Sequence, residues 1–214
     1  MCSNYEIPTR EALALLDVEV DQLELDLKPH IYPGYHAPII MKNFDLDFGK
    51  FGLLPSWAKD FKFSSYTYNA RTETVAEKPS FRHAWKYSKF CLVPVQEFYE
   101  PKYIDGKPHW YTIKREDDQP FTVAAIYDDA VIKDSKVRSF SMLTINSDKH
   151  PFMKQFHAPS DEKRSIIVIP EEYRKDWLNV DRENAHEYFF EMRDEFVTFP
   201  RDHSSDVTKQ SDLF

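Results

Sequence analysis

The residues best suited to covalent chemistry are the first two, Met1 and Cys2, because removing the initiator methionine would leave Cys2 at the N-terminus. An N-terminal cysteine carries an amine with an ordinary pKa of about 8 beside a thiol with one of about 8.5. An aldehyde could form a Schiff base with the amine. The thiolate could then close onto the same carbon to give a thiazolidine, because proximity makes this second step effectively unimolecular. Taken alone, Cys2 is more simply interpreted as an inert residue of a frayed terminus.

The length of 214 residues suits one large domain or two small ones, and we favour one. No apolar run is long enough to cross a bilayer, and the N-terminus lacks the charged and then apolar pattern of a signal peptide. We therefore expect a soluble cytoplasmic protein with no membrane partner. In a reducing compartment we expect no disulfide between Cys2 and Cys91, and Cys91 lies in an apolar run predicted to be a core strand.

The charge is unevenly distributed along the chain. The net charge is −8, yet residues 62–115 hold ten Lys and Arg against five Asp and Glu, a local balance of +5. This net charge argues against a simple nucleic-acid binder, whose usual footprint is basic. The basic middle could form one anion-binding face, although a solvated surface of mixed charge gives the same counts.

The elements that would position Cys2 are mostly short strands. Apolar runs between turn signals predict them at 39–41, 89–95, 110–113, 121–127, 140–145, 165–170 and 196–199, with Asp105-Gly106 as a hairpin turn. Short helices are expected at 11–16 after Thr9, from Thr72 toward 76, at 80–85, at 171–178 after Pro170, and from Asp181 to about 193. Residues 58–68 are predicted to be a loop, and 18–27 fits either a strand or a helix.

This succession of elements predicts an α+β fold. We expect a single β-rich domain over residues 1–200, with a mainly antiparallel sheet or irregular barrel and flanking helices, followed by a polar tail at 201–214. With only four glycines there is no phosphate-binding loop, and there is no His-Glu-x-x-His helix or zinc-spaced cysteine pair. We therefore expect neither a metal nor an organic cofactor.

Five motifs occur along the chain in a recognisable order. They are Met1-Cys2, Asn69-Ala70-Arg71-Thr72-Glu73-Thr74, Phe81-Arg82, Cys91-Leu92-Val93-Pro94 leading to Phe98-Tyr99-Glu100, and His157 before a last apolar strand. In this order they resemble the SRAP (SOS-response-associated peptidase) family, HMCES/YedK type, from residue 1 to about residue 180. Each motif is common by itself, and only the ordered set is specific.

The resemblance implies a compact β-rich domain that acts in the DNA damage response. Members of the family look like suicidal repair proteins that bind single-stranded DNA. They trap the ring-opened aldehyde of an abasic site as a thiazolidine on the N-terminal cysteine, after removing their own initiator methionine. For this chain the resemblance implies single-stranded DNA containing abasic sites as the partner, with hydrolase-like self-processing and lyase-like imine chemistry. We expect the chain to act as a monomer.

Four residues take catalytic roles by the same resemblance. Cys2 would be the covalent nucleophile, and Asn69 would hold its amine and the opened sugar through the side-chain amide. Glu100 would be the acid/base, which requires a carboxyl group near Cys2 with a raised pKa. His157 would be a second proton carrier that assists opening of the sugar ring. Without the resemblance, Asn69 could cap a helix, Glu100 could end an exposed strand and His157 could be a loop residue.

The resemblance also implies a DNA-binding surface. Arg71, Arg82 and Lys86 would attract phosphates without regard to sequence. Tyr66 and Tyr68 would stack on bases, in place of the tryptophans that the family often has before Asn-Ala-Arg.

The chain departs from the family pattern at two further points. Ser3-Asn4 follows Cys2, where glycine is usual, so the first turn is expected to differ. Residues 158–164 follow His157, where the family commonly has a close Arg-Met-Pro.

Two other functions remain open from the residues. In an N-terminal-nucleophile amidohydrolase, Cys2 would attack an amide carbonyl of a small metabolite and Asn69 would help to stabilise the oxyanion. Such an enzyme needs no basic face. In a non-enzymatic single-strand binding module Cys2 would be inert, and changing it would leave DNA binding unaffected.

Overall fold

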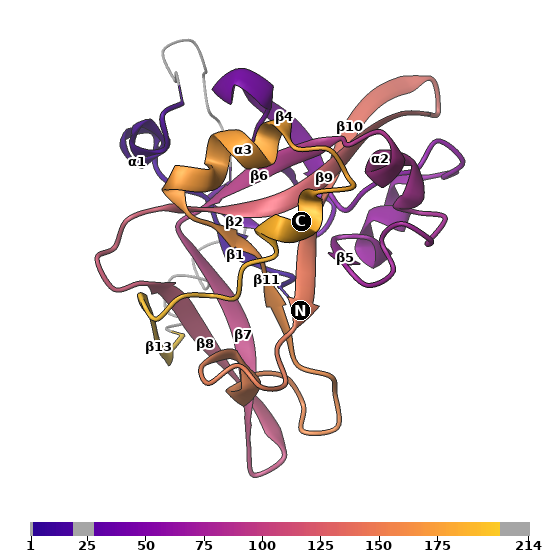
Figure 1. Cartoon of the computed structure of the whole chain (residues 1–214). Coiled ribbons are helices and arrows are strands. Elements are labelled where there is room, and N and C mark those ends of the chain that lie inside the picture. The colour runs from indigo at the N-terminus through magenta and orange to yellow at the C-terminus, as the bar shows by residue number, and fades with distance from the viewer. Residues whose placement is uncertain (1, 19–27, 202–214) are drawn as a thin grey trace.

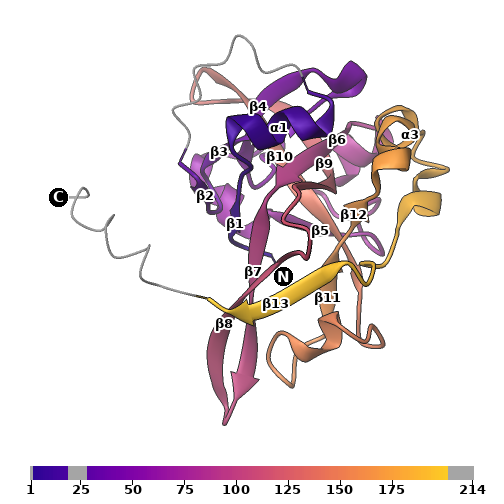
Figure 2. The same cartoon turned by 90° about the vertical axis from the view of Figure 1, so that its left-hand side faces the viewer.

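The computed structural model describes residues 2–18 and 28–201, and two β-sheets form most of the molecule (Figures 1 and 2). The first sheet is antiparallel, with the strand order β13-β8-β7-β1-β2. Its strands are β1 (Tyr5–Glu6), β2 (His30–Ile31), β7 (Glu97–Ile104), β8 (Lys107–Arg115) and β13 (Phe196–Pro200).

The second sheet closes into a small barrel. Its order is β11-β10-β4-β3-β6-β9-β12, and β9 also pairs with β10, so five strands form a ring. The short strand β5 adds to β10 in parallel. The strands are β3 (His36–Ile40), β4 (Leu46–Phe51), β5 (Asn69–Arg71), β6 (Phe90–Val95), β9 (Phe121–Ile132), β10 (Ser135–Asn146), β11 (Arg164–Ile166) and β12 (Val168–Ile169). The expectation of a β-rich domain with an irregular barrel is confirmed.

The helices are short and lie at the periphery, with α1 and α3 at the end of the molecule opposite the projecting β7-β8 hairpin (Figures 1 and 2). The α-helices are α1 (Arg10–Leu13), α2 (Arg82–Lys86) and α3 (Arg174–Asn179). The 3-10 helices are η1 (Ala14–Leu16), η2 (Lys42–Phe44), η3 (Phe61–Tyr66), η4 (Met153–Gln155), η5 (Glu171–Tyr173) and η6 (Ala185–Tyr188). Thr9 caps α1 as predicted, because its hydroxyl oxygen accepts from the Ala12 amide at 3.2 Å. No helix in the described ranges has the length and apolar character needed to cross a membrane.

Strand β6 is buried on both of its faces. Cys91 and Val93 join one core cluster, together with Cys2 and residues from the five-stranded sheet. Phe90 and Leu92 point the other way, as the two-residue period of a strand requires, into a second cluster covered by α1 and α3. The placement of Cys91 in the core is therefore confirmed, and the continuous apolar run 90–95 reflects cover on two sides.

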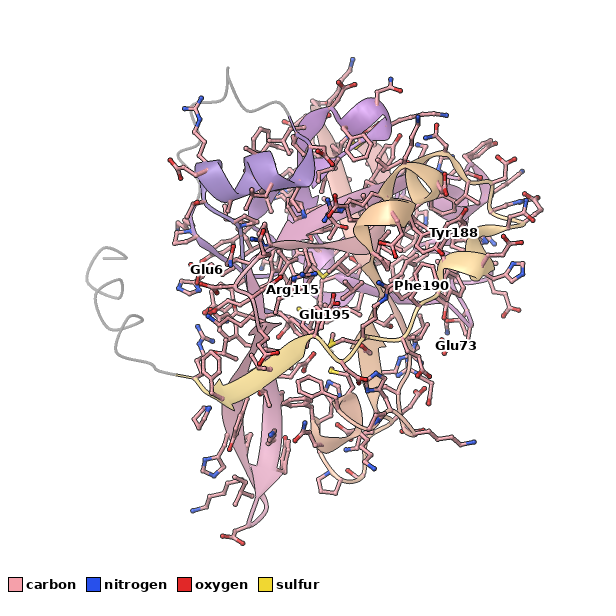
Figure 3. All side chains as sticks on the ribbon, turned by 60° about the vertical axis from the view of Figure 1, so that its left-hand side comes forward. Glu6, Glu73, Arg115, Tyr188, Phe190 and Glu195 are labelled. Carbon is pink, nitrogen blue, oxygen red and sulfur yellow. The ribbon has the colours of Figure 1, made fainter. Side chains whose placement is uncertain are left out.

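Strand β13 is attached to β8 through an ion pair as well as its backbone. Arg115 at the end of β8 lies 3.0 Å from Glu195, just before β13, and the two labels adjoin in Figure 3. The predicted strand near 196–199 is thus confirmed. The hairpin turn at Asp105-Gly106 is confirmed too, since both residues have positive φ, at 50° and 73°.

Three local predictions were wrong. Thr72 caps no helix, because its amide and hydroxyl both donate to the Thr144 carbonyl and so extend the pairing of β5 with β10. The helix expected over 181–193 is reduced to η6, because Tyr188 and Phe190, which lie near each other in Figure 3, turn back toward α3. Both rings pack on Tyr173. The predicted loop 58–68 contains the 3-10 helix η3. The undecided stretch 18–27 beyond Val18 and the predicted tail beyond Arg201 lie outside the described residues.

Gly52 should be far less tolerant of substitution than Gly106. Gly52 has φ +107°, and a Cβ there would meet the Ser64 backbone oxygen at 2.1 Å, whereas a Cβ on Gly106 would meet nothing within 4 Å. Both substitutions carry the left-handed backbone cost of about 1–2 kcal/mol. Only Gly52→Ala adds a backbone clash, so it should lower the unfolding free energy by at least about 2 kcal/mol more than Gly106→Ala. Urea unfolding of the two variants measures this, and equal losses would contradict it.

Candidate active site

Cys2 reaches its position through the antiparallel pairing of β1 with β7. The paired positions are Tyr5 with Phe98 and Glu6 with Glu97. The register continues toward the N-terminus, because the Tyr99 amide donates to the Asn4 carbonyl at 3.2 Å. Each step back from β1 is a step forward along β7, so this register continues to Ser3 opposite Glu100 and Cys2 opposite Pro101, the residue next to Glu100. Cys2 and Glu100 are both buried.

Asn69 fixes the backbone of Cys2 from the other sheet. It begins β5, and its Nδ2 donates to the Cys2 carbonyl oxygen at 2.7 Å. Its Oδ1 is buried and accepts no hydrogen bond from the described part of the chain. The alternative role of Asn69 as a helix cap is excluded, since the next helix after β5, α2, begins only at Arg82.

Glu100 and His157 form a buried pair. His157 Nε2 lies 2.9 Å from Glu100 Oε2. The loop that carries His157 is tied to β7, because the His157 amide donates to the Pro101 carbonyl at 2.7 Å. His157 itself has φ 65°, in the left-handed region that non-glycine residues seldom adopt. The Lys163 amine donates to the His157 and Ala158 carbonyls, at 3.2 and 2.6 Å, and helps to hold this conformation.

The pKa of the Glu100 carboxyl group and the pKa of the Cys2 thiol are shifted in opposite directions. Burial alone would raise the pKa of Glu100, but the positive charge of the chain's amino terminus and a hydrogen bond from His157 hold that pKa below its ordinary 4.5. The prediction of a raised pKa for Glu100 is therefore wrong. Burial and the nearby Glu100 charge raise the pKa of the Cys2 thiol well above its ordinary value. The site thus pairs an ionised carboxylate with a protonated thiol.

The two predicted tyrosines are placed differently. The Tyr68 ring packs edge-on against Phe51, and its pKa is raised by burial and by the charges of Glu100 and Cys2, which sets it at the site. Tyr66 is 81% exposed and free to contact a ligand. Of these two tyrosines, Tyr66 alone has the exposure needed for base stacking.

An aromatic residue that the sequence analysis missed lies in the same loop. Trp57 is 52% exposed and, with Tyr66 and Phe63, lines an open hollow of about 380 Å³ that also includes Lys59 and Lys62. An exposed tryptophan beside lysines is the combination that single-stranded nucleic acids favour. The sequence signal was present, since Trp57 follows Pro55-Ser56 and precedes Lys59.

This loop closes on itself at its two ends. The Leu53 amide donates to the Thr67 carbonyl at 3.2 Å, and the Thr67 hydroxyl donates to the Leu53 carbonyl at 2.7 Å. Residues 53–67 therefore leave and rejoin the barrel at one place, directly before Asn69.

The predicted basic residues do not form one cluster. Arg82 and Lys86 line an open hollow of about 590 Å³ on α2, beside Trp85, Tyr87 and Arg182. Arg71 lies on β5, two residues from Asn69, and donates to Glu162 at 2.7 Å. The structure thus brings Cys2, Asn69, Glu100 and His157 together and leaves Arg82 and Lys86 on a separate surface. No group of His, Cys, Asp or Glu in the described ranges could hold a metal ion.

Comparison with known proteins gives a family match over almost the whole chain. The family model described as SOS response associated peptidase (SRAP) matches residues 1–202. An abasic site processing protein of Bacillus subtilis, YoaM, is 31% identical over 195 residues, which cover 84% of this chain and 79% of that protein. An abasic site processing protein of Saccharomyces cerevisiae, YMR114C, is 27% identical over 77% of this chain but only 42% of its own length.

Two solved structures have the same fold. A protein from Bordetella bronchiseptica aligns with a TM-score of 0.86 at 24% identity, over 94% of this chain and all of that one. A protein from Bacteroides thetaiotaomicron aligns with a TM-score of 0.79 at 22% identity, over 97% and 95% of the two chains.

The stability contributed by Glu100 should depend on pH. Because its pKa is lowered in the folded state, its ionisation stabilises the fold above the unfolded value of 4.5, and this contribution is lost as the pH falls through the lower folded value. The stability advantage of the wild type over Glu100→Gln should therefore shrink as the pH falls below 4.5. Urea unfolding across the acid range measures it, and parallel curves for the two proteins would contradict an ionised Glu100.

Proposed function

Because this chain belongs to the SOS response associated peptidase (SRAP) family, we propose that it captures abasic sites in single-stranded DNA through a covalent bond to Cys2. The observation that carries this proposal is that Asn69 binds the backbone of Cys2, while the charge of Glu100, which is paired with His157, acts on the Cys2 thiol. These four residues suffice to build the proposed site without a second subunit, and we propose that the chain acts as a monomer.

The first step is hydrolysis of the Met1-Cys2 peptide bond. It consumes one water and releases methionine, leaving the α-amine of Cys2 free. Glu100, ionised at neutral pH, can accept a proton from the attacking water, and His157 can return one to the leaving amine. Asn69 holds the carbonyl of Cys2, which is the carbonyl on the product side and not the one cleaved. It therefore acts by orienting Cys2.

The second step joins Cys2 to the opened sugar. The Cys2 amine adds to the aldehyde carbon of the abasic site, and loss of one water leaves an imine. The thiol sulfur then adds to the imine carbon while its proton passes to the imine nitrogen, which closes the thiazolidine. The net reaction joins protein and DNA and releases one water.

The raised pKa of the thiol has a mechanistic consequence. A protonated Cys2 thiol is a weak nucleophile, so the amine reacts first and the thiol needs a base at the moment of ring closure. The carboxylate of Glu100 is the charged group that the Cys2 thiol senses most strongly, and we assign that base role to it.

DNA binding is assigned to the exposed basic and aromatic side chains near β5. Arg71 would contact a phosphate, and Trp57 and Tyr66 would stack on bases at the loop 53–67. Arg82 and Lys86 would extend the path over α2.

The decisive experiment combines purified protein with a single-stranded oligonucleotide that carries one abasic site. A heat-stable band on a denaturing gel is expected with the wild type and not with Cys2→Ala, and intact-mass measurement should show loss of Met1. Glu100→Gln should slow both reactions by about a hundredfold or more. An undamaged oligonucleotide is the control.

The other outcomes separate the remaining alternatives. Loss of Met1 without any DNA adduct would favour the amidohydrolase. Retention of Met1 with unaltered DNA binding in Cys2→Ala would favour the non-covalent binding module.

Removing the ring of Trp57 should weaken binding of undamaged single strands. One lost base stack corresponds to about 1–3 kcal/mol, or about 5- to 150-fold in affinity. Fluorescence anisotropy with Trp57→Ala measures the change. Phe199→Ala removes a similarly exposed ring from the edge strand β13 and should bind like the wild type. Equal affinities for Trp57→Ala and Phe199→Ala would show that Trp57 does not contribute to DNA binding.

A further inference from the structure

Arg71, the arginine nearest the site on β5, already contacts a carboxylate of its own chain. Its Nη1 lies 2.7 Å from Glu162 Oε2, and the two side chains are 47% and 35% exposed. A guanidinium in this position would otherwise offer its donors to an incoming phosphate.

Glu162 is held in this place by groups other than Arg71. Its Oε1 accepts from Arg164 Nη1 at 2.8 Å and from Asn146 Nδ2 at 3.1 Å. Arg164 is itself buried and fixed by a bidentate pair with Glu73 at 2.8 and 2.9 Å and by the Thr144 carbonyl. Glu73 lies at the surface, as its label in Figure 3 shows. The Glu162 carboxylate is therefore anchored and does not depend on Arg71 for its position.

Arg71 and Asn69 share one side of β5. Alternate residues of a strand point the same way and lie about 7 Å apart, whereas the intervening Ala70 is buried. A DNA strand whose abasic sugar reaches Cys2 beside Asn69 would thus bring a neighbouring phosphate close to Arg71. The same phosphate would lie close to Glu162, because Glu162 is bound to Arg71.

We propose that Glu162 sets the discrimination between intact and abasic DNA by competing with phosphate for Arg71. This rests on the proposed function. Intact DNA is held only by reversible contacts, so a fixed carboxylate that occupies the Arg71 guanidinium shortens the residence time of intact DNA. An abasic strand is held by a covalent bond once it reacts, and its final retention does not depend on Arg71. Glu162 belongs to the segment 158–164 in which this chain departs from the family pattern.

The test compares Glu162→Gln with the wild type in two assays. Anisotropy at low salt should show intact single-stranded DNA bound about threefold tighter or more by Glu162→Gln, because one phosphate competitor is removed. The crosslinking rate on an abasic oligonucleotide at saturating protein should be unchanged. An excess of intact DNA should therefore inhibit crosslinking more strongly in the variant.

Three matched variants assign the effect to Arg71. Glu172→Gln removes the same charge from another exposed ion pair, Arg193–Glu172 at 2.9 Å, and should bind like the wild type. Glu162→Asp keeps the charge and should also stay close to the wild type, whereas a purely structural role would tolerate the isosteric Gln better than the shorter Asp. In an Arg71→Ala background, Glu162→Gln should have no effect on affinity.

The outcomes are distinct from those of the proposed function. Unchanged affinity in Glu162→Gln, or an equal gain in the Arg71→Ala background, overturns the role of Glu162 while wild-type crosslinking still stands. Absence of a wild-type crosslink overturns the proposed function itself. Thermal unfolding of each variant checks that affinities are compared between folded proteins.

Discussion

The site depends on one pairing, that of β1 with β7. Strand β1 has only two residues, yet its register with β7 continues to Cys2 beside Pro101, the residue next to Glu100. Because side chains alternate along a strand, a slip of one residue would turn the Tyr5 side chain to the opposite face of the sheet and would shift Cys2 relative to Glu100. Tyr5 anchors the register by burying its ring among core residues, edge-on to Phe51 of β4. The packing of Tyr5, three positions along the chain, therefore determines where Cys2 lies.

Around this pairing, the two sheets contribute different residues of the candidate site. The five-stranded sheet supplies Glu100 on β7, and the barrel sheet supplies Asn69 on β5. His157 comes from a loop after β10 and is tied back to β7 through its backbone amide. The buried pair of Glu100 and His157 thus lies at the junction of the sheets, where burial excludes water and strengthens every charge interaction. The chain's amino terminus contributes to this balance, because its charge is one reason that Glu100 remains ionised.

The sequence predicted the strands well because they are continuous apolar runs bounded by turn residues, as at 90–95. It failed where tertiary contacts override local preference. Thr72 has the composition of a helix cap but pairs with β10, and 181–193 has helical propensity that its aromatic side chains override by packing on Tyr173. The ordered motifs indicated four residues that the structure brings together, but not the low pKa of Glu100, which arises from charges far apart in the sequence. Trp57 escaped notice because exposure cannot be read from residue type.

The closed ends of the loop 53–67 make it a self-contained insert in the barrel. Both backbone junctions are hydrogen-bonded to each other, so the loop's interior can change in sequence or length at little entropic cost to the rest of the fold. Gly52 limits this freedom at one point, where the barrel and Ser64 approach too closely for any side chain. Cys2, Asn69, Glu100 and His157 lie outside the insert. The loop 53–67 can therefore differ among relatives, and with it the groups that the surface contacts, while the position of Cys2 stays the same.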